Sequence, residues 1–189
     1  MRKFHSAVLA AALTAATAAG LAAADATANA TTATAGHATR SAAAWRKGSV
    51  AANERVVRSF LRDVINQHHG DHAGHYLTRD MQWHGGTVGT VKGRTNVAGL
   101  FAGVVASLPN AHASIKDIFG QGDQVVVRVV VRGTQKGALL GIPATGRNIH
   151  WDGVDVYRLI GGKISAIWAG DDWTAILFYT GTFKAPWIH

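Results

Sequence analysis

Apolar residues recur with helical spacing where the folded part of the chain begins. Six of them fall at i, i+1, i+4, i+5, i+8 and i+9, which places them on one stripe of a helix: Val56, Val57, Phe60, Leu61, Val64 and Ile65. The pattern predicts a helix that begins at Asn53, a residue well suited to cap it, and runs through Ile65. Residues 95–107 predict a second long helix, which ends at the Leu-Pro-Asn sequence of residues 108–110.

The second half of the chain alternates apolar and polar residues instead. This pattern predicts strands at residues 113–119, 124–132, 136–142, 148–159 and 163–168, after a shorter strand around 82–84. The Gly-rich turns between them are of hairpin length, so we expect antiparallel pairing. Residues 173–179 predict a short closing helix. Helices followed by a meander of strands indicate an α+β domain with its helices on one face of a sheet.

The first fifty residues have a different composition. Arg2 and Lys3 precede an apolar run at residues 7–21, and small residues follow it, which is the order of a secretory signal. We predict a signal peptide at residues 1–26, cleaved after Ala24 or Ala26, then a flexible leader at 27–50, the domain at 51–183 and a tail at 184–189. The Ala-rich run is too weakly apolar for a stable membrane anchor, so we expect a secreted protein.

The amino-acid composition limits the kinds of site and partner that the chain can have. The 189 residues include no cysteine, which excludes a disulfide scaffold or a thiolate metal site, and Glu54 is the only glutamate among eleven acids. The formal net charge is +8, but basic residues cluster only on the first helix, at Arg55, Arg58 and Arg62. That spacing makes a solvated stripe, so we predict no nucleic-acid partner.

Particular residues resemble a known family. The resemblance runs from about residue 53 to 181, and its most specific part is the G-x-P-x-T-G-[RK] turn at residues 141–147, followed by Asp155, Arg158 and the Gly-Lys-Ile sequence of 162–164. These residues are similar to the SnoaL-like polyketide cyclases, also labelled ester cyclases. The resemblance implies an NTF2-like cone, in which a curved, mostly antiparallel sheet wraps around an apolar cavity with N-terminal helices. It also implies ring closure by an intramolecular aldol step without a cofactor, and a homodimer formed through the sheet face.

One position departs from that family pattern. The pattern has an acid and base Asp directly after the aromatic or basic residue of the last strand, where this chain has Ala169 after Trp168. The resemblance places Asp155 toward the cavity, and alternation along the strand then places Trp151, Gly153 and Tyr157 there too. Asp155 is therefore the first catalytic candidate; a buried Asp satisfied by a backbone or hydroxyl donor is the other interpretation.

Two further residues complete the catalytic candidates. His84 follows Trp83 where the family places polar pocket residues; it either donates to a substrate oxygen or lies at the rim, bonded to the Gly85-Gly86 turn. Asp172 either reaches the pocket or caps the closing helix, as Asp171 would. The predicted substrate-binding residues are aromatic: Trp83, Trp151, Tyr157 and Trp168.

A histidine cluster stands before the early strand. His68, His72 and His75 have i, i+4 and i, i+3 spacings that suit Zn, Cu or Ni, yet Gly70 and Gly74 weaken a helix there. We predict neither a bound metal nor a cofactor. If the protein did bind a metal, these three histidines would be its candidate ligands. Three hypotheses stand: a secreted cyclase using Asp155 and His84, a non-catalytic binder of an apolar or aromatic small molecule, and a metal-binding surface.

Overall fold

The computed structural model describes residues 48–184 and 186–187 of the chain. The predicted signal peptide and nearly all of the predicted leader lie outside the described residues. Within the described part, no helix is both long enough and apolar enough to span a bilayer. The α+β architecture predicted from the hydrophobic pattern is confirmed.

The helices of this part are α1 (Val50–Phe60), α2 (Ala73–Tyr76), α3 (Arg94–Ser107) and α4 (Trp173–Thr180). A π-helical turn, η1 (Leu61–Asn66), continues α1, and short 3-10 turns follow at η2 (Gly70–His72) and η3 (Gly86–Val88). The cap at Asn53 was a wrong prediction, because Ser49 accepts the hydrogen bond from the Ala52 amide and the helix starts one turn earlier. Asn53 is buried and donates instead to the Gly122 carbonyl.

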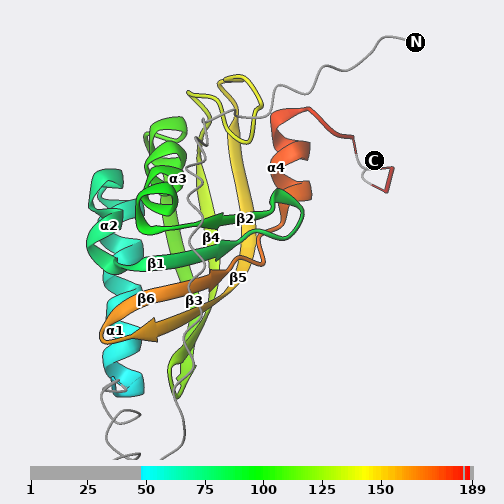
Figure 1. Cartoon of the computed structure of the whole chain (residues 1–189). Coiled ribbons are helices and arrows are strands. Elements are labelled where there is room, and N and C mark those ends of the chain that lie inside the picture. Colours follow the sequence, from blue (N-terminus) through cyan, green and yellow to red (C-terminus); the bar gives the residue numbers. More distant parts are fainter. Residues whose placement is uncertain (1–47, 185, 188–189) are drawn as a thin grey trace, which may run out of the picture. The chain divides into compact units, whose positions relative to one another are not determined.

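Six strands form one curved sheet in the order β2-β1-β6-β5-β4-β3 (Figure 1). The strands are β1 (Leu77–His84), β2 (Thr90–Lys92), β3 (His112–Gln121), β4 (Gln124–Thr134), β5 (Asn148–Ile160) and β6 (Lys163–Trp168). All neighbouring pairs are antiparallel except β1 with β6. Figure 1 shows α1, α2 and α3 on one face of the sheet, with α4 beside the end of β5.

The strand predicted at residues 136–142 does not form. Both edges of β4 are already occupied, by β3 and β5, so this segment cannot fold back to pair with the strand that precedes it. Its backbone groups find other partners: the amides of Lys136 and Gly137 donate to the Ser107 carbonyl at the end of α3. The buried Gln135 side chain donates to the carbonyls of Ile142 and Pro143, and Leu139 pairs with Ile142.

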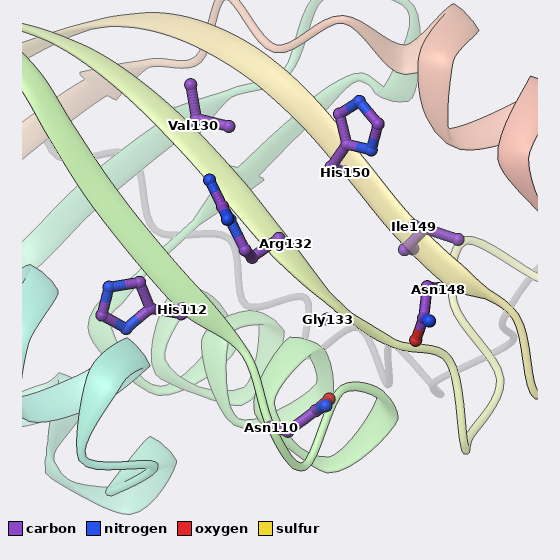
Figure 2. A pocket seen from close by; sticks show the side chains of 8 residues that line it. All are labelled: Asn110, His112, Val130, Arg132, Gly133, Asn148, Ile149 and His150. Atoms are coloured by element: carbon purple, nitrogen blue, oxygen red, sulfur yellow. The ribbon is translucent and has the colours of Figure 1, made fainter.

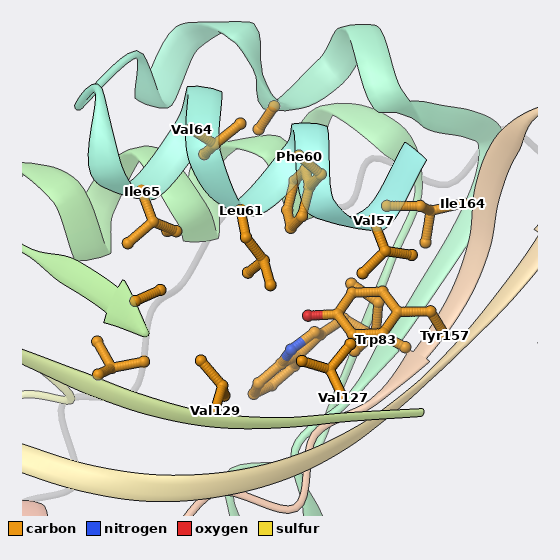
Figure 3. Packing of buried hydrophobic residues seen from close by; sticks show 14 of the residues in the cluster. Val57, Phe60, Leu61, Val64, Ile65, Trp83, Val127, Val129, Tyr157 and Ile164 are labelled. Carbon is orange, nitrogen blue, oxygen red and sulfur yellow. The ribbon is translucent and has the colours of Figure 1, made fainter. Parts of the chain in front are cut away.

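The core lies between α1, η1 and the inner face of the sheet, the face turned toward these helices. Figure 3 shows side chains of α1 and η1 pointing toward Trp83 and Tyr157 of the sheet. Burial alternates along β4 and β5, so Val127, Val129 and Tyr157 are buried while Arg128 is exposed. This alternation decides which residues can reach an internal site.

The outer face of the sheet carries exposed apolar side chains as well as charges. Val154 and Trp168 are 51% and 37% exposed there. The homodimer expected through this face stays a prediction.

Candidate functional site

An apolar cavity of about 110 Å³ opens between η1, α3, α4 and the inner face of the sheet. Apolar cavities of roughly 150 Å³ accept a benzene-sized molecule, so this one is of the order of a single ring. Three of the four predicted substrate-binding aromatics line it, namely Trp83, Trp151 and Tyr157. Trp173 of α4 also lines it and meets Trp83 edge to face, with ring centroids 6.2 Å apart.

Asp155 enters this cavity from the middle of β5. It is 8% exposed, and strand alternation puts it on the inner face with Trp151 and Tyr157. Its Oδ1 accepts from the Gly170 amide at 3.2 Å and its Oδ2 accepts from the Tyr157 hydroxyl at 3.3 Å. The carboxyl group therefore has a fixed orientation while one side of it faces the cavity.

Asp171 is a second carboxyl group in the cavity, which the sequence interpretation treated mainly as a helix cap. After β6 the chain continues antiparallel to β5 in the same register, and Asp171 bridges Gly153. The Trp151 indole donates to Asp171 Oδ1 at 2.7 Å. The signal for this position was present, because Ile167, Ala169 and Asp171 continue the two-residue period of β6 beyond its end, and all three line the cavity.

Gly153 allows the two carboxyl groups to approach each other. A Cβ atom at this position would lie 2.9 Å from Asp171 Oδ1 and 3.7 Å from Asp155 Oδ1. Both oxygens thus lie within 4 Å of one point, and a side chain there would displace at least one of them. The absence of a side chain at Gly153 is what makes a carboxyl pair fit this wall of the cavity.

Their surroundings give the two carboxyl groups different pKa values. Burial and then the charge of Asp171 raise the pKa of Asp155 to about 8, against the opposing hydrogen bonds from Gly170 and Tyr157. Burial raises the pKa of Asp171 to about 6, opposed by the Trp151 hydrogen bond. At neutral pH the pair therefore retains one proton between its two carboxyl groups, and the deeper burial of Asp155 favours the proton on that group. Two carboxyl groups with separated pKa values are an arrangement that supports an acid and a base side by side.

Three predicted site residues lie away from the cavity. Trp83 and Ile167 point inward, so their strand neighbours His84 and Trp168 point to the other side, where the two rings stack with centroids 5.4 Å apart. His84 Nδ1 bonds to Thr90 Oγ1 instead of to a cavity group. Asp172 is exposed and caps α4 by accepting from the Ala175 amide at 3.0 Å. None of the three therefore lines the cavity, and for Asp172 the alternative interpretation as a helix cap is confirmed.

A second, shallow hollow of about 460 Å³ lies on the outer face of the sheet. His112, Arg132 and His150 face one another across β3, β4 and β5, flanked by Asn110 and Asn148 (Figure 2). Its lining includes no carboxyl group. It therefore lacks the acid and base pair that the apolar cavity has.

The histidine cluster has a different membership from the predicted one. His68 bonds through Nε2 to the Ala111 carbonyl, and among the described residues the metal-ligating atoms that gather are those of Asp63, His69 and His72. Of the three named candidates only His72 belongs to this group. Asp63 could not be recognised from spacing because it comes from η1, before the loop that carries the histidines.

Comparison with known proteins identifies the family of the chain. No curated protein sequence matches the chain. Among solved structures it resembles AclR from Streptomyces galilaeus, with 20% identity and a TM-score of 0.64 over 72% of this chain and 100% of AclR. A protein from Jannaschia sp. CCS1 named as a SnoaL-like polyketide cyclase has 19% identity and a TM-score of 0.63, over 74% of this chain and 98% of its own.

A protein from Catenulispora acidiphila with a ketosteroid isomerase-like fold has 21% identity and a TM-score of 0.58, over 71% of this chain and 97% of its own. These likenesses confirm the NTF2-like fold that the resemblance implied. The family model of the SnoaL-like polyketide cyclases matches residues 55–178, from α1 into α4. Because that match spans most of the chain and nearly all of the sheet and helices described above, the protein belongs to the SnoaL-like polyketide cyclase family.

Proposed function

We propose that the protein is a cofactor-independent cyclase that closes a ring in a poly-β-ketone, with Asp171 as base and Asp155 as acid. The observation that carries this proposal is the pair of buried carboxyl groups beside Gly153, with pKa values separated around neutrality. Membership in a polyketide cyclase family supports a cyclase-type function. The single-ring size of the cavity and its Trp and Tyr lining support a flat, apolar reacting segment.

The chemistry of the pair fits an intramolecular aldol step. Ionised Asp171 removes a proton from a carbon that lies between two carbonyl groups, and the C–H electrons move into the enolate. The enolate carbon attacks a second carbonyl carbon of the same molecule, a C–C bond forms, and the electrons of that C=O bond move to its oxygen. Protonated Asp155 donates its proton to this oxygen. A proton returned from Asp171 to Asp155 restores the pair, so the step is an isomerisation without a net gain or loss of atoms.

Ala169 favours a second candidate, a non-catalytic binder. This methyl group lines the cavity at the position where the family resemblance implies the acid and base Asp. The binder hypothesis keeps the apolar cavity and its aromatic contacts but assigns Asp155 and Asp171 a purely structural role.

The pH dependence of turnover distinguishes these candidates. With a linear poly-β-keto ester as substrate, we expect kcat/KM for ring closure to rise around pH 6, as Asp171 loses its proton, and to fall around pH 8, as Asp155 loses its own. Liquid chromatography with mass detection follows the reaction, as conversion of the linear ester into a cyclic product of the same mass. Saturable quenching of tryptophan fluorescence by the ester, without ring closure at any pH between 5 and 9 (roughly the working range of the two carboxyl groups), would favour the binder.

We also propose that the cyclase acts outside the cell, on the basis of the charge, apolar run and small residues at its N-terminus. The mature chain is expected to start just after Ala24 or Ala26. N-terminal sequencing of protein recovered from the culture medium measures this directly. Recovery of the chain from the cell interior with Met1 or Arg2 at its start would contradict export.

A further inference from the structure

A compact group of metal-ligating atoms lies on η1 and η2, apart from the cavity. His69 Nδ1 lies 2.7 Å from Asp63 Oδ1, and His72 Nδ1 lies 3.2 Å from the same oxygen. The three ligand atoms all lie within 4.8 Å of one another. The side chains of His69 and His72 are 48% and 39% exposed, whereas that of Asp63 is 20% exposed. An ion from solvent can therefore reach both imidazoles and a partly sheltered carboxylate.

A second layer of contacts fixes the carboxylate. The Tyr76 hydroxyl donates to Asp63 Oδ2 at 2.9 Å and leaves Oδ1 facing the two imidazoles. Tyr76 is itself held by an edge contact with Phe60, at 5.6 Å between ring centroids. The hydrogen bonds from His69, Tyr76 and His72 lower the pKa of Asp63 to about 2, so the carboxylate is ionised at neutral pH. A hydrogen-bonded carboxylate of this kind is typical of the outer contacts that orient metal ligands.

The loop that carries the histidines is anchored at both ends. The buried Gly70 packs so closely on α3 that a Cβ atom there would lie 2.8 Å from the Ala102 Cα. Before it, His68 adopts a left-handed backbone with φ of 61°, and its ring bonds to the Ala111 carbonyl at 2.9 Å. These anchors fix the backbone on either side of His69, so little backbone ordering is left for a ligand to impose there.

We propose that Asp63, His69 and His72 bind one divalent transition-metal ion, with Zn²⁺ as the best fit and Ni²⁺ or Cu²⁺ as alternatives of the same class. Two imidazole nitrogens and one carboxylate oxygen suit these ions, whereas Mg²⁺ and Ca²⁺ prefer oxygen ligands. Ligands bound tetrahedrally at 2.0–2.2 Å lie about 3.3–3.6 Å apart, which small rotations of the two exposed imidazoles would achieve. The ion would replace the protons that the imidazoles now share with Asp63, and water would complete its coordination.

A metal ion bound at this site would act on the fold and not on the carboxyl pair. η1 carries Asp63 away from the core, while its other side contributes Leu61 and Ile65 to the cavity wall. A bound ion would cross-link η1 to η2 and so stabilise the part of the cavity wall that η1 contributes. The inference is independent of the proposed cyclase activity, and its test needs no substrate.

Isothermal titration of the full chain, carrying no polyhistidine tag, with ZnCl₂ tests the proposal. We expect one Zn²⁺ per chain bound through this site and a rise in Tm with Zn²⁺ that Mg²⁺ does not produce. His72→Ala and Asp63→Asn should each weaken this binding at least about 100-fold, and Tyr76→Phe by about 10–100-fold, as loss of an outer contact does. The matched controls are His112→Ala, an exposed histidine on β3, and Asp71→Asn, an exposed acid in η2; both should leave the affinity within about twofold, the usual context scatter.

His69→Ala provides a variant in which folding is not at issue, because this side chain is about half exposed. Circular dichroism confirms its fold, and we expect the same loss of Zn²⁺ binding. In the parent protein, nitrogen hyperfine splitting from two imidazoles in the electron paramagnetic resonance spectrum of bound Cu²⁺ would support the ligand set. Zn²⁺ affinity that survives both His69→Ala and His72→Ala would overturn the proposal, as would an equal loss in the His112→Ala control.

Discussion

Replacing Asp171 by Asn is expected to lower kcat for ring closure by about 10²–10⁴-fold, the contribution of a positioned base. The amide has nearly the same shape, so its oxygen can still accept from the Trp151 indole, now 2.7 Å from Oδ1. What it loses is the ability to take a proton from a carbon acid. Ligand affinity, measured by tryptophan fluorescence, should change much less than kcat, because the aromatic lining is intact.

Asp172→Asn is the matched control, since it makes the same chemical change one residue further along the chain. Asp172 is exposed and caps α4, and Asn is as good a cap as Asp. We therefore expect nearly unchanged activity in this variant. Asp155→Asn should behave like Asp171→Asn if Asp155 supplies the proton to the new hydroxyl group. Turnover that persists at the parent rate in Asp171→Asn would exclude Asp171 as the base, and persistence in both variants would exclude the pair.

The sequence predicted the parts of this fold that depend on local periodicity. The two long helices, the strands β3 to β6 and the placement of Trp151 and Tyr157 on the same face as Asp155 follow from spacing of 3.6 or two residues. The segment at 136–142 shows the limit of that reasoning. It has an apolar composition suited to a strand, but the preceding strand β4 is already paired on both sides, with β3 and β5, and that is a property of the whole topology.

The residues of the candidate site likewise divide into those that the sequence could place and those that only the tertiary structure places. The family resemblance placed both Asp155 and His84 toward the cavity. Asp155 lines the cavity, whereas His84 points away from it because its strand neighbour Trp83 points inward. Asp171 lies beyond the last hydrogen-bonded residue of β6, and only the backbone bridge to Gly153 shows that the strand direction continues. The grouping of Asp63 with His69 depends on how η1 and the following loop pack, which spacing alone does not reveal.

The second large effect expected is on stability, because a buried carboxyl pair makes folding dependent on pH. The pKa values of Asp155 and Asp171 are both raised in the folded chain, to about 8 and about 6 from an ordinary 3.8. Between pH 4 and 8 the folded chain therefore binds more protons than the unfolded chain, and the free energy of unfolding falls as pH rises. A fall of roughly 7 kcal/mol across this window is expected, since the two pKa values are raised by about six units in total and each unit corresponds to about 1.4 kcal/mol.

Urea unfolding at several pH values measures this fall, and Asp155→Asn identifies its source. The variant has no proton to lose at this position, so its stability should change with pH only through Asp171, mainly below pH 6, and should exceed that of the parent at pH 8. Asp63 acts with the opposite sign, since its pKa is lowered to about 2, but only below about pH 4, outside the window. A parent stability that is flat between pH 5 and 8 (the range the two raised pKa values span) would contradict the buried pair. A variant that is more stable and less active than the parent would instead indicate that the chain retains these two carboxyl groups for chemistry, at the expense of stability.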